Sequence, residues 1–213
     1  MEIKVFNKEN IISSVSYDQE DIIKNILFLY CPDGIDCDPT YSKGIFYKRI
    51  PQPKLKFDLR PQVGGVVQSD CQSLPLDDCS IRSIMFDPPF IGGSIGLGKK
   101  GIIKERFGIY KNIPILWKMY RGALKEFYRI LVSNGVLIFK CQDTIENSRQ
   151  YFSEYKIIKD ALDIGFYPKD KFILIAKNRL ISPSQRIQQH CRKFHSYFLV
   201  FIKCHSKVNY EDL

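Results

Sequence analysis

The stretch Ser83-Ile84-Met85-Phe86-Asp87-Pro88-Pro89-Phe90 decides how the rest of the chain is interpreted. An apolar run typical of a buried strand ends here at an acid, two prolines and an aromatic residue. A strand cannot continue through two prolines, because proline lacks a backbone N–H donor and has a fixed φ angle. Asp87 is therefore predicted in a rigid turn at the carboxyl end of a strand, beside the Pro88 carbonyl and the Phe90 ring. In open α/β sheets, ligands bind at this end of the strands.

The composition is that of a globular protein with an excess of basic residues. The chain has 213 residues, of which 45% are hydrophobic and 26% charged, and we expect one domain over residues 1–213. The formal net charge of +9 favours a polyanionic partner, although many basic proteins bind none. No apolar run approaches the ~20 residues that span a bilayer, and residues 1–4 do not resemble the start of a signal peptide. We expect an intracellular, cytoplasmic protein with no membrane partner.

The cysteine and histidine patterns do not favour a metal site. Seven cysteines occur without a Cys-x-x-Cys pair, so neither a complete disulfide framework nor a zinc-ribbon spacing is present. His190, Cys191 and His195 could form a metal site, but buried thiols and surface imidazoles are the commoner explanation for such residues. We expect no bound metal.

Hydrophobic periodicity predicts an alternation of strands and helices. Seven strands are predicted, at residues 25–30, 54–58, 65–70, the run ending at Asp87, 136–140, 171–176 and 196–202. Apolar residues three and four apart predict a helix over 113–131, and a second helix over 149–162 is closed by Gly165. No convincing helix separates the last two strands, which predicts that they pair antiparallel.

Three segments are expected outside the regular elements. Residues 1–24 are predicted to form a loosely packed N-terminal extension or a short helix, and residues 31–44 a loop after the first strand. Residues 91–112 are rich in glycine and basic side chains, and a loop of this length is usually functional or disordered. Its position directly after the Asp87 turn indicates a loop on the substrate side.

Acidic residues end three successive predicted strands, Asp58, Asp70 and Asp87. The carboxyl ends of parallel strands meet at one edge of a sheet, so these carboxylates are expected to line a common cleft.

Four segments together resemble one enzyme family. Asp87-Pro88-Pro89-Phe90 resembles the catalytic Asp/Asn-Pro-Pro-aromatic motif of the S-adenosylmethionine-dependent methyltransferases that modify exocyclic amino groups of nucleic-acid bases. Residues 70–75 and 78–84 resemble the acid-x-x-x-Leu-Pro and Asp-x-Ser-x-x-x-Ile stretches that precede that motif, and residues 124–138 are similar to the helix and strand that follow it. The resemblance implies a Rossmann-like, seven-stranded α/β methyltransferase fold with an antiparallel last strand.

The resemblance implies a catalytic role for Asp87, Pro88, Pro89 and Phe90. An exocyclic amine is a poor nucleophile because its lone pair is delocalised into the ring. The Asp87 carboxylate and the Pro88 carbonyl are both acceptors, so they can take the two amine N–H groups, orient the nitrogen and stabilise its developing charge. Phe90 offers a face on which the base can stack.

The resemblance also implies S-adenosyl-L-methionine as cofactor. Asp58 would bind its ribose hydroxyls, Asp70 and Cys71 would meet the adenine edge, and Leu74 is a further expected cofactor-binding residue. No Gly-x-Gly follows the first predicted strand, so another segment must hold the methionine part. The residues expected to replace it, similar to a Thr-Tyr-Ser-Lys-Gly arrangement of phage-type methyltransferases, are Asp36, Asp38, Thr40, Tyr41, Ser42, Lys43 and Gly44.

Two basic sets are predicted to contact nucleic-acid phosphates. They are Lys99, Lys100, Lys104 and Arg106 in the loop after the Asp87 turn, and Arg179, Arg186, Arg192 and Lys193 between the last two strands. DNA is the expected partner, with adenine N6 as the first choice of acceptor and cytosine N4 as the second.

Other functions stay open on the sequence alone. RNA or a protein glutamine amide suits the same pair of acceptors, and a silent nucleic-acid-binding subunit is compatible with the absent Gly-x-Gly. Residues 93–100 fit the phosphate-loop pattern Gly-x-x-x-x-Gly-Lys. Lys100, however, stands where that motif has Ser or Thr, and the segment follows a turn rather than a strand, which disfavours a nucleotide hydrolase.

Overall fold

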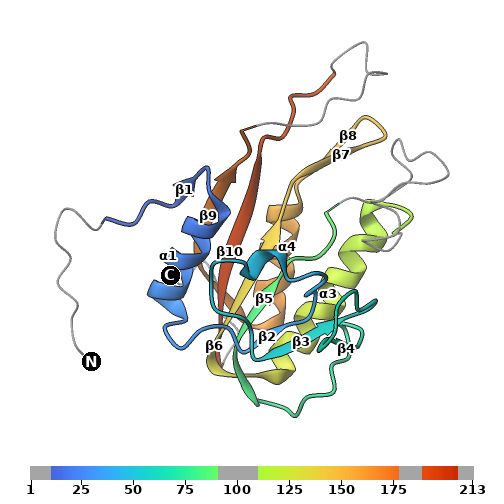
Figure 1. Ribbon diagram of the computed structural model, residues 1–213. Helices are drawn as coiled ribbons and strands as arrows, with labels where there is room; N and C mark the ends of the chain where they lie inside the picture. The colour runs from blue at the N-terminus through green and yellow to red at the C-terminus, as the bar shows by residue number, and fades with distance from the viewer. Residues whose placement is uncertain (1–10, 91–109, 178–188, 206–213) are drawn as a thin grey trace.

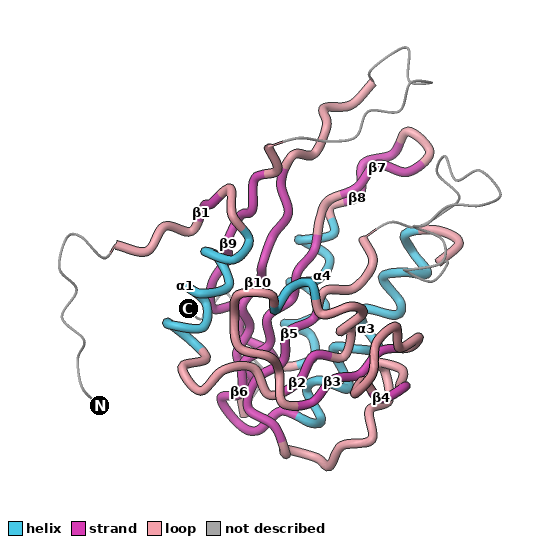
Figure 2. The backbone as a smooth tube through the Cα atoms, viewed as in Figure 1, coloured by secondary structure: helices cyan, strands magenta, loops and turns pink. Residues whose placement is uncertain are grey.

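A computed structural model describes residues 11–90, 110–177 and 189–205 (Figure 1). The described chain forms an eight-stranded sheet in the order β1-β9-β10-β6-β5-β2-β3-β4. Its strands are β1 Val15–Ser16, β2 Cys37–Asp38, β3 Leu55–Asp58, β4 Val67–Gln68, β5 Ile81–Phe86, β6 Leu131–Cys141, β9 Phe166–Ile175 and β10 His195–Lys203. The helices are α1 Gln19–Tyr30, α3 Ile113–Ile130 and α4 Ser153–Ile164, with a 3₁₀ turn, η2, at Ile45–Tyr47. After β6, strands β7 Thr144–Glu146 and β8 Arg149–Tyr151 pair antiparallel as a separate hairpin (Figure 2).

The strand directions confirm the predicted fold class. All neighbours in the sheet pair parallel except β10, which lies antiparallel between β9 and β6. Seven strands make up the expected arrangement, and β1 adds a short eighth strand beside β9. From β2 the chain proceeds outward to β3 and β4, then returns to the other side of β2 as β5. The strand order therefore reverses between β2 and β5, and such a reversal opens a crevice at the carboxyl ends of the two strands.

Helices cover both faces of the sheet (Figure 1). On the α3 and α4 side, the Phe86 ring packs edge-to-face against Phe127 and Phe139, with centroids 4.8 Å apart in each pair. On the other side, α1 buries Ile22 and Ile26 completely against the sheet. Edge-to-face aromatic pairs add to area burial, so β5 is fixed firmly just before it delivers Asp87.

The first predicted strand, residues 25–30, is wrong, because these residues end the helix α1. Ile22, Ile23 and Ile26 follow helical spacing, and the Asp18 carboxylate accepts a hydrogen bond from the Glu20 N–H at 2.8 Å as the N-cap. A short apolar run does not by itself distinguish a strand from a buried helix. The strand that follows α1 is β2, which lies within the predicted loop 31–44.

Of the two forms expected for residues 1–24, the described part fits the short helix, since α1 begins at Gln19, and not the loosely packed extension. β1 joins the sheet, and the first half of α1 belongs to the core rather than to a loosely packed segment.

Other boundaries differ in detail. The strand predicted at 65–70 shortens to β4, a two-residue edge strand, and Gly65 lies in a turn at φ 76°. The helix predicted from residue 149 begins at Ser153, because residues 149–151 pair with β7 as β8. The other predicted elements are confirmed within a few residues: the helix at 113–131, and the strands at 54–58, before Asp87, at 136–140, 171–176 and 196–202. Two of these strands, β6 and β9, begin about five residues earlier than predicted. The antiparallel pairing of the last two strands is confirmed as well.

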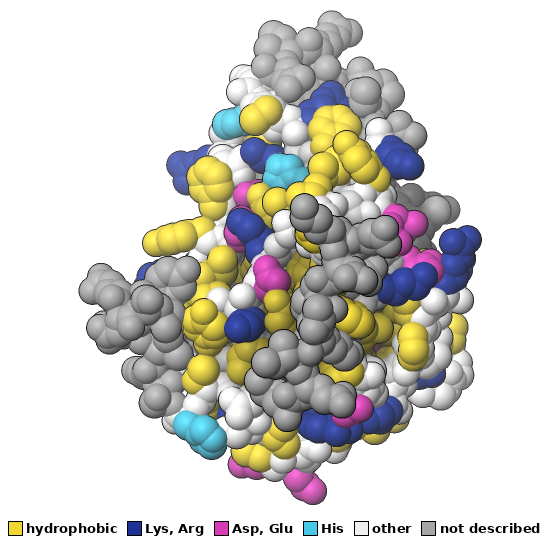
Figure 3. All heavy atoms as spheres, turned by 90° about the vertical axis from the view of Figure 1, so that its left-hand side faces the viewer, with side chains coloured by type: hydrophobic (Ala, Val, Ile, Leu, Met, Phe, Trp, Pro, Cys, Tyr) yellow, Lys and Arg dark blue, Asp and Glu magenta, His cyan; other side chains and the backbone are white. Residues whose placement is uncertain are grey.

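The side of the molecule that carries α1 is a mixed surface (Figure 3), on which hydrophobic side chains alternate with Lys and Arg. Exposed hydrophobic residues of this N-terminal part include Val15, Tyr17 and Leu29. None of the helices within the described ranges is long and apolar enough to cross a bilayer.

Candidate active site

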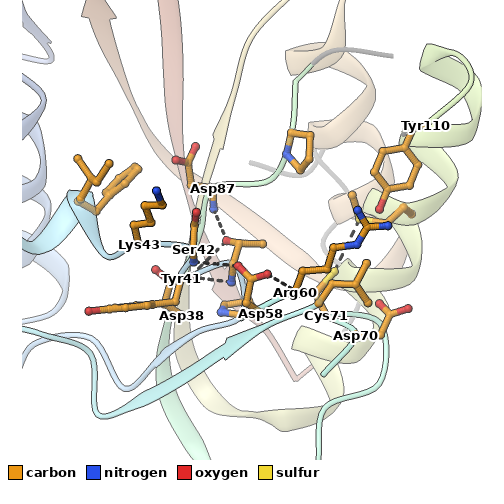
Figure 4. A pocket seen from close by; sticks show the side chains of 17 residues that line it. Asp38, Tyr41, Ser42, Lys43, Asp58, Arg60, Asp70, Cys71, Asp87 and Tyr110 are labelled. Atoms are coloured by element: carbon orange, nitrogen blue, oxygen red, sulfur yellow. Dashed lines mark hydrogen bonds between the residues drawn. The ribbon is translucent and has the colours of Figure 1, made fainter. Parts of the chain in front are cut away.

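The carboxyl ends of β2, β3 and β5 and the residues after β4 surround one cavity of about 210 Å³ (Figure 4). Each of these four strands contributes a carboxyl group to it, so the convergence expected from the sequence is present. The lining residues are Asp38, Pro39, Thr40, Tyr41, Ser42, Lys43, Ile45, Phe46, Asp58, Leu59, Arg60, Asp70, Cys71, Asp87, Pro89, Tyr110 and Met119.

The Asp87 turn is held from two sides. Its backbone N–H donates to the Thr40 hydroxyl at 3.0 Å, which ties the end of β5 to the loop after β2. The Tyr120 hydroxyl, on α3, donates to the Pro89 carbonyl. Both prolines prevent the strand from continuing, so these two hydrogen bonds define where the turn lies.

The loop after β2 is fixed to the end of β3. The Tyr41 N–H donates to the Phe57 carbonyl at 3.0 Å, and the Ser42 N–H donates to the Asp58 carboxylate at 2.8 Å. Ser42 has φ 52°, a left-handed conformation that a non-glycine residue rarely adopts, and Gly44 follows at φ 65°. The loop thus makes its sharp turn without a Gly-x-Gly, because the Asp58 carboxylate stabilises the unfavourable conformation at Ser42.

Asp58 retains acceptor capacity after making these contacts. One carboxylate oxygen accepts from the Ser42 N–H and the other from the Arg60 N–H at 2.7 Å. A carboxylate offers about four lone-pair sites, so each oxygen can accept one more hydrogen bond from a ligand in the cavity.

Asp38 is a buried acid with a perturbed pKa. Its carboxyl group accepts from the Thr40 N–H at 2.8 Å and from the Tyr47 hydroxyl at 2.7 Å. Burial raises the pKa of Asp38 to about 7, and the neighbouring Asp87 carboxylate adds to the increase, while the Tyr47 and Thr40 hydrogen bonds oppose it. Asp38 therefore changes protonation state near neutral pH.

Asp87 faces a cation that the sequence analysis did not single out. The Lys140 ammonium, at the carboxyl end of β6, lies 3.5 Å from the Asp87 carboxylate. Burial raises the pKa of Asp87, and the charge and hydrogen bond of Lys140 act against that rise. The sequence does contain a signal for Lys140, because this residue ends the predicted apolar strand 136–140, and the carboxyl end of that strand lies at the same sheet edge as the carboxylates.

Beside Asp70 and Arg60, the wall of the cavity also includes less polar side chains (Figure 4). Cys71 Sγ lies 3.7 Å from the Met119 sulfur of α3, and Tyr110 lines the same region (Figure 4). Burial raises the pKa of the Cys71 thiol, and raises that of Tyr110 to about 12. The Cys71 and Tyr110 side chains are therefore neutral at physiological pH. With Met119, they present a thiol, an aromatic ring and a thioether to the cavity.

Three residues predicted for the cofactor site do not line this cavity. Asp36 pairs with Lys54 at 2.6 Å and accepts from the Arg82 N–H at 2.8 Å. Burial disfavours its charged form, but Lys54 and the Arg82 N–H outweigh that effect and lower the pKa of Asp36. Leu74 is a core residue, and Gly44 lies beside the cavity rather than on its wall.

The remaining catalytic predictions lie around the turn. Pro88 is buried, and Phe90 is partly exposed with its ring centroid 5.6 Å from the Lys140 nitrogen.

The basic residues are only partly described. Arg192 and Lys193 precede β10 and are partly exposed. The other predicted phosphate contacts lie outside the described residues, as does the segment 93–100 that fits the phosphate-loop pattern: Lys99, Lys100, Lys104, Arg106, Arg179 and Arg186.

The histidines and cysteines make ordinary contacts. Within the described ranges, no group of three His, Cys, Asp or Glu side chains is arranged to hold a metal ion. The His195 ring nitrogen lies 2.8 Å from the Tyr197 hydroxyl, and His190 contacts the Ser148 carbonyl at 3.0 Å. All seven cysteines are free thiols.

Several lining residues could not be assigned from the sequence. Tyr110 reaches the cavity from the segment before α3 and Met119 from the first half of α3, and Ile45 and Phe46 reach it from η2. Nothing in their local sequence distinguishes them from ordinary core residues.

Comparisons with known proteins identify the fold. No protein-family model matches the sequence, and no curated protein matches it either. Among solved structures, the chain is similar to one from the complex between the Haloferax volcanii Trm112 methyltransferase activator and a methyltransferase, at 14% identity and a TM-score of 0.51, over 88% of this chain and 90% of that one. The fold is Rossmann-like and methyltransferase-type.

Two further structures show how far the likeness extends. The [4+2]-cyclase SpnF matches at 10% identity with a TM-score of 0.51, over 87% of this chain and 81% of that one. A DNA modification methylase of Thermus thermophilus, complexed with S-adenosyl-L-methionine, matches at 17% identity with a TM-score of 0.45, over 67% of this chain. The present chain spans 57% of that methylase. One fold hosts different reactions, so function has to be argued from the site.

Proposed function

We propose that this protein is an S-adenosylmethionine-dependent methyltransferase that acts on an exocyclic amino group of a nucleic-acid base. Adenine N6 in DNA is the expected acceptor and cytosine N4 the next. One observation carries the proposal: Asp87 and Pro89 of the turn line the same cavity as Asp38, Asp58 and the residues after β4. A methyl donor and an acceptor amine bound there would meet at Asp87.

The residues of the cavity fit the proposed cofactor. Asp58 has free acceptor sites for ribose hydroxyls. The side chains of Cys71, Tyr110 and Met119 offer an apolar surface that suits a purine ring. Lys43 lines the cavity on the loop after β2, where a cation can pair with the carboxylate of the methionine part. When bound, S-adenosylmethionine supplies an electrophilic methyl group on its sulfonium.

The residues of the turn fit the proposed acceptor. An ionised Asp87 accepts hydrogen bonds and donates none, so it orients an amine N–H and favours the positive charge that develops on nitrogen. The Pro88 carbonyl is the second acceptor of the pair. Phe90, partly exposed after the turn, offers a ring for stacking with a base that has left the duplex.

Charge favours a nucleic acid over a protein as substrate. The net charge of +9 and the partly exposed Arg192 and Lys193 suit a phosphate backbone. RNA provides the same phosphates and the same amines, so DNA is chosen over RNA on the resemblance of the turn alone.

A pair of variants tests the two halves of the site separately. Asp87→Ala should reduce methyl transfer at least ~100-fold, by loss of an acceptor that acts on the reacting amine, and should change the dissociation constant of S-adenosylmethionine less than ~3-fold. Asp58→Ala should act mainly on binding, and should raise the dissociation constant of S-adenosylmethionine ~10-fold or more. Calorimetry measures the binding, and label transfer from S-adenosylmethionine measures the turnover.

The results separate the enzyme from a silent subunit. If the wild-type protein binds no S-adenosylmethionine at millimolar concentration with nucleic acid present, the silent nucleic-acid-binding subunit is the correct description. If Asp87→Ala retains turnover within a few-fold of wild type, the catalytic assignment of the turn is wrong.

A further inference from the structure

Lys140 has an unusual position for a lysine. It is the last residue but one of the apolar strand β6, only 9% of the residue is exposed, and its ammonium group lies 3.5 Å from Asp87, which lines the cavity. Lysine is rarely this buried without a partner. Its ammonium group therefore needs partners that account for all three of its hydrogens.

The structure supplies these partners from several different segments. The Lys140 nitrogen donates to the Gln19 side-chain oxygen at 2.9 Å and lies 3.5 Å from the Asp87 carboxylate. The ring centroids of Phe46, Phe90 and Phe198 lie 4.6, 5.6 and 5.5 Å from the same nitrogen. Aromatic faces attract a cation within about 6 Å, more strongly when water is excluded. The ammonium group is thus held in place and largely desolvated.

The surroundings of Asp87 make this cation important. Among the described residues, the charged and titratable groups that act on Asp87 are Lys140 of β6, Asp38 of β2, Tyr47 of η2 and Tyr120 of α3. A charged Asp38 repels a negative charge on Asp87, and the two tyrosines are neutral. Lys140 is therefore the group in this set that favours the ionised form of Asp87. An opposite charge at this range favours ionisation of a carboxyl group.

We propose that Lys140 is a positioning residue of the active site, whose ammonium group keeps Asp87 ionised and holds its carboxylate at the mouth of the cavity. The proposal rests on the proposed function for its consequence in turnover. Its physical basis, the ion pair, can be measured without any substrate. A protonated Asp87 would be a donor and could no longer accept the amine N–H.

Removal of the charge should change the pH dependence of the reaction rather than the reaction at every pH. For Lys140→Met, label transfer should be at least tenfold slower than wild type at pH 6 and within threefold at pH 9. Lys140→Arg keeps the charge and should stay within threefold of wild type at both pH values. Gln19→Leu removes a group that holds the lysine, so it should shift the profile in the same direction by a smaller amount.

A matched control distinguishes this role from a general loss of an ion pair. Lys171 pairs with Glu154 at 3.0 Å and lies over the Tyr197 ring, and none of these three residues lines the cavity. Lys171→Met should leave the pH profile unchanged.

A substrate-free measurement makes the proposal independent of the enzyme assay. Carbon NMR titration of the aspartate carboxyls, with Asp87→Asn used to assign the signal, should show Asp87 titrating at higher pH in Lys140→Met than in wild type. The proposal is overturned if that titration does not move, or if Lys140→Met is slowed by the same factor from pH 6 to pH 9. If the wild-type protein transfers no methyl group, the proposed function fails, and the titration alone decides whether Lys140 controls Asp87.

Discussion

Asp38 links the two halves of the site through one short chain of contacts. Its carboxyl group accepts from the Thr40 N–H, and the Thr40 hydroxyl accepts from the Asp87 N–H. A change in the protonation state of Asp38 can therefore affect the Asp87 turn through Thr40 alone. Because the pKa of Asp38 is about 7, its protonation state changes within the physiological pH range.

The raised pKa of Asp38 predicts how stability depends on pH. The folded protein holds this proton more tightly than the unfolded chain, so the stabilisation is fully present below the ordinary pKa of 3.8 and is lost as pH rises through about 7. Asp38→Asn cannot lose that proton. Relative to wild type, the variant should gain on the order of 2–4 kcal/mol of unfolding free energy between pH 4 and pH 8.

Denaturant unfolding at several pH values measures this difference. Asp77→Asn, on the exposed connector before β5, is the control for the loss of an acidic side chain. A difference between Asp38→Asn and wild type that is constant from pH 4 to pH 8 would show that Asp38 does not titrate there.

At the scale of elements, the acidic strand ends could be predicted and the first element could not. Asp58, Asp70 and Asp87 stand after short apolar runs, and parallel strands bring such ends together. The run before residue 31 is apolar enough for either a strand or a buried helix, and it is helical because α1 packs its apolar side chains on the sheet. β2 has only two residues because Pro39 follows it, too few for a periodic pattern.

The same limit explains the missed site residues. Lys140, Phe46 and Phe198 come together from β6, η2 and β10, and no local pattern records a contact between three distant segments. Asp36 belongs to the loop that the sequence predicts to replace the missing Gly-x-Gly. Tertiary pairing with Lys54 and Arg82 places it elsewhere.

The end of α4 offers a test of the packing between α3, α4 and β9. Gly165 has φ 121°, and its N–H caps the helix by donating to the Ala161 and Leu162 carbonyls. A Cβ atom there would meet the Tyr128 ring at 2.9 Å. Gly165→Ala should therefore lower the unfolding free energy by about 2 kcal/mol or more, from backbone strain and steric overlap.

Gly64→Ala is the matched substitution. Gly64 is exposed, and no atom lies within 4 Å of the Cβ it would gain. Its unfolding free energy should stay within about 0.5 kcal/mol of wild type. Equal effects of the two substitutions in denaturant unfolding would contradict the described junction of α4 and β9.

At the scale of the whole molecule, the strand order places the chemistry. The chain leaves β2 in one direction and returns as β5 on its other side, so the loop after β2 and the Asp87 turn share one crevice. The predicted fold class and the shared edge of carboxylates followed from the sequence. A [4+2]-cyclase matches the same architecture with a TM-score of 0.51. The arrangement therefore provides the place for a reaction without specifying which one.

The most direct test of the proposed function is to identify the methylated product. S-adenosylmethionine labelled on its methyl group is supplied with duplex DNA, single-stranded DNA, RNA and protein in parallel, with wild type and Asp87→Ala, and the products are digested and analysed by mass spectrometry. The account predicts label in N6-methyladenine, or otherwise N4-methylcytosine, from DNA with the wild-type protein and its loss with Asp87→Ala. Label on RNA or glutamine alone would contradict the choice of DNA, and no label on any acceptor would contradict the methyltransferase assignment itself.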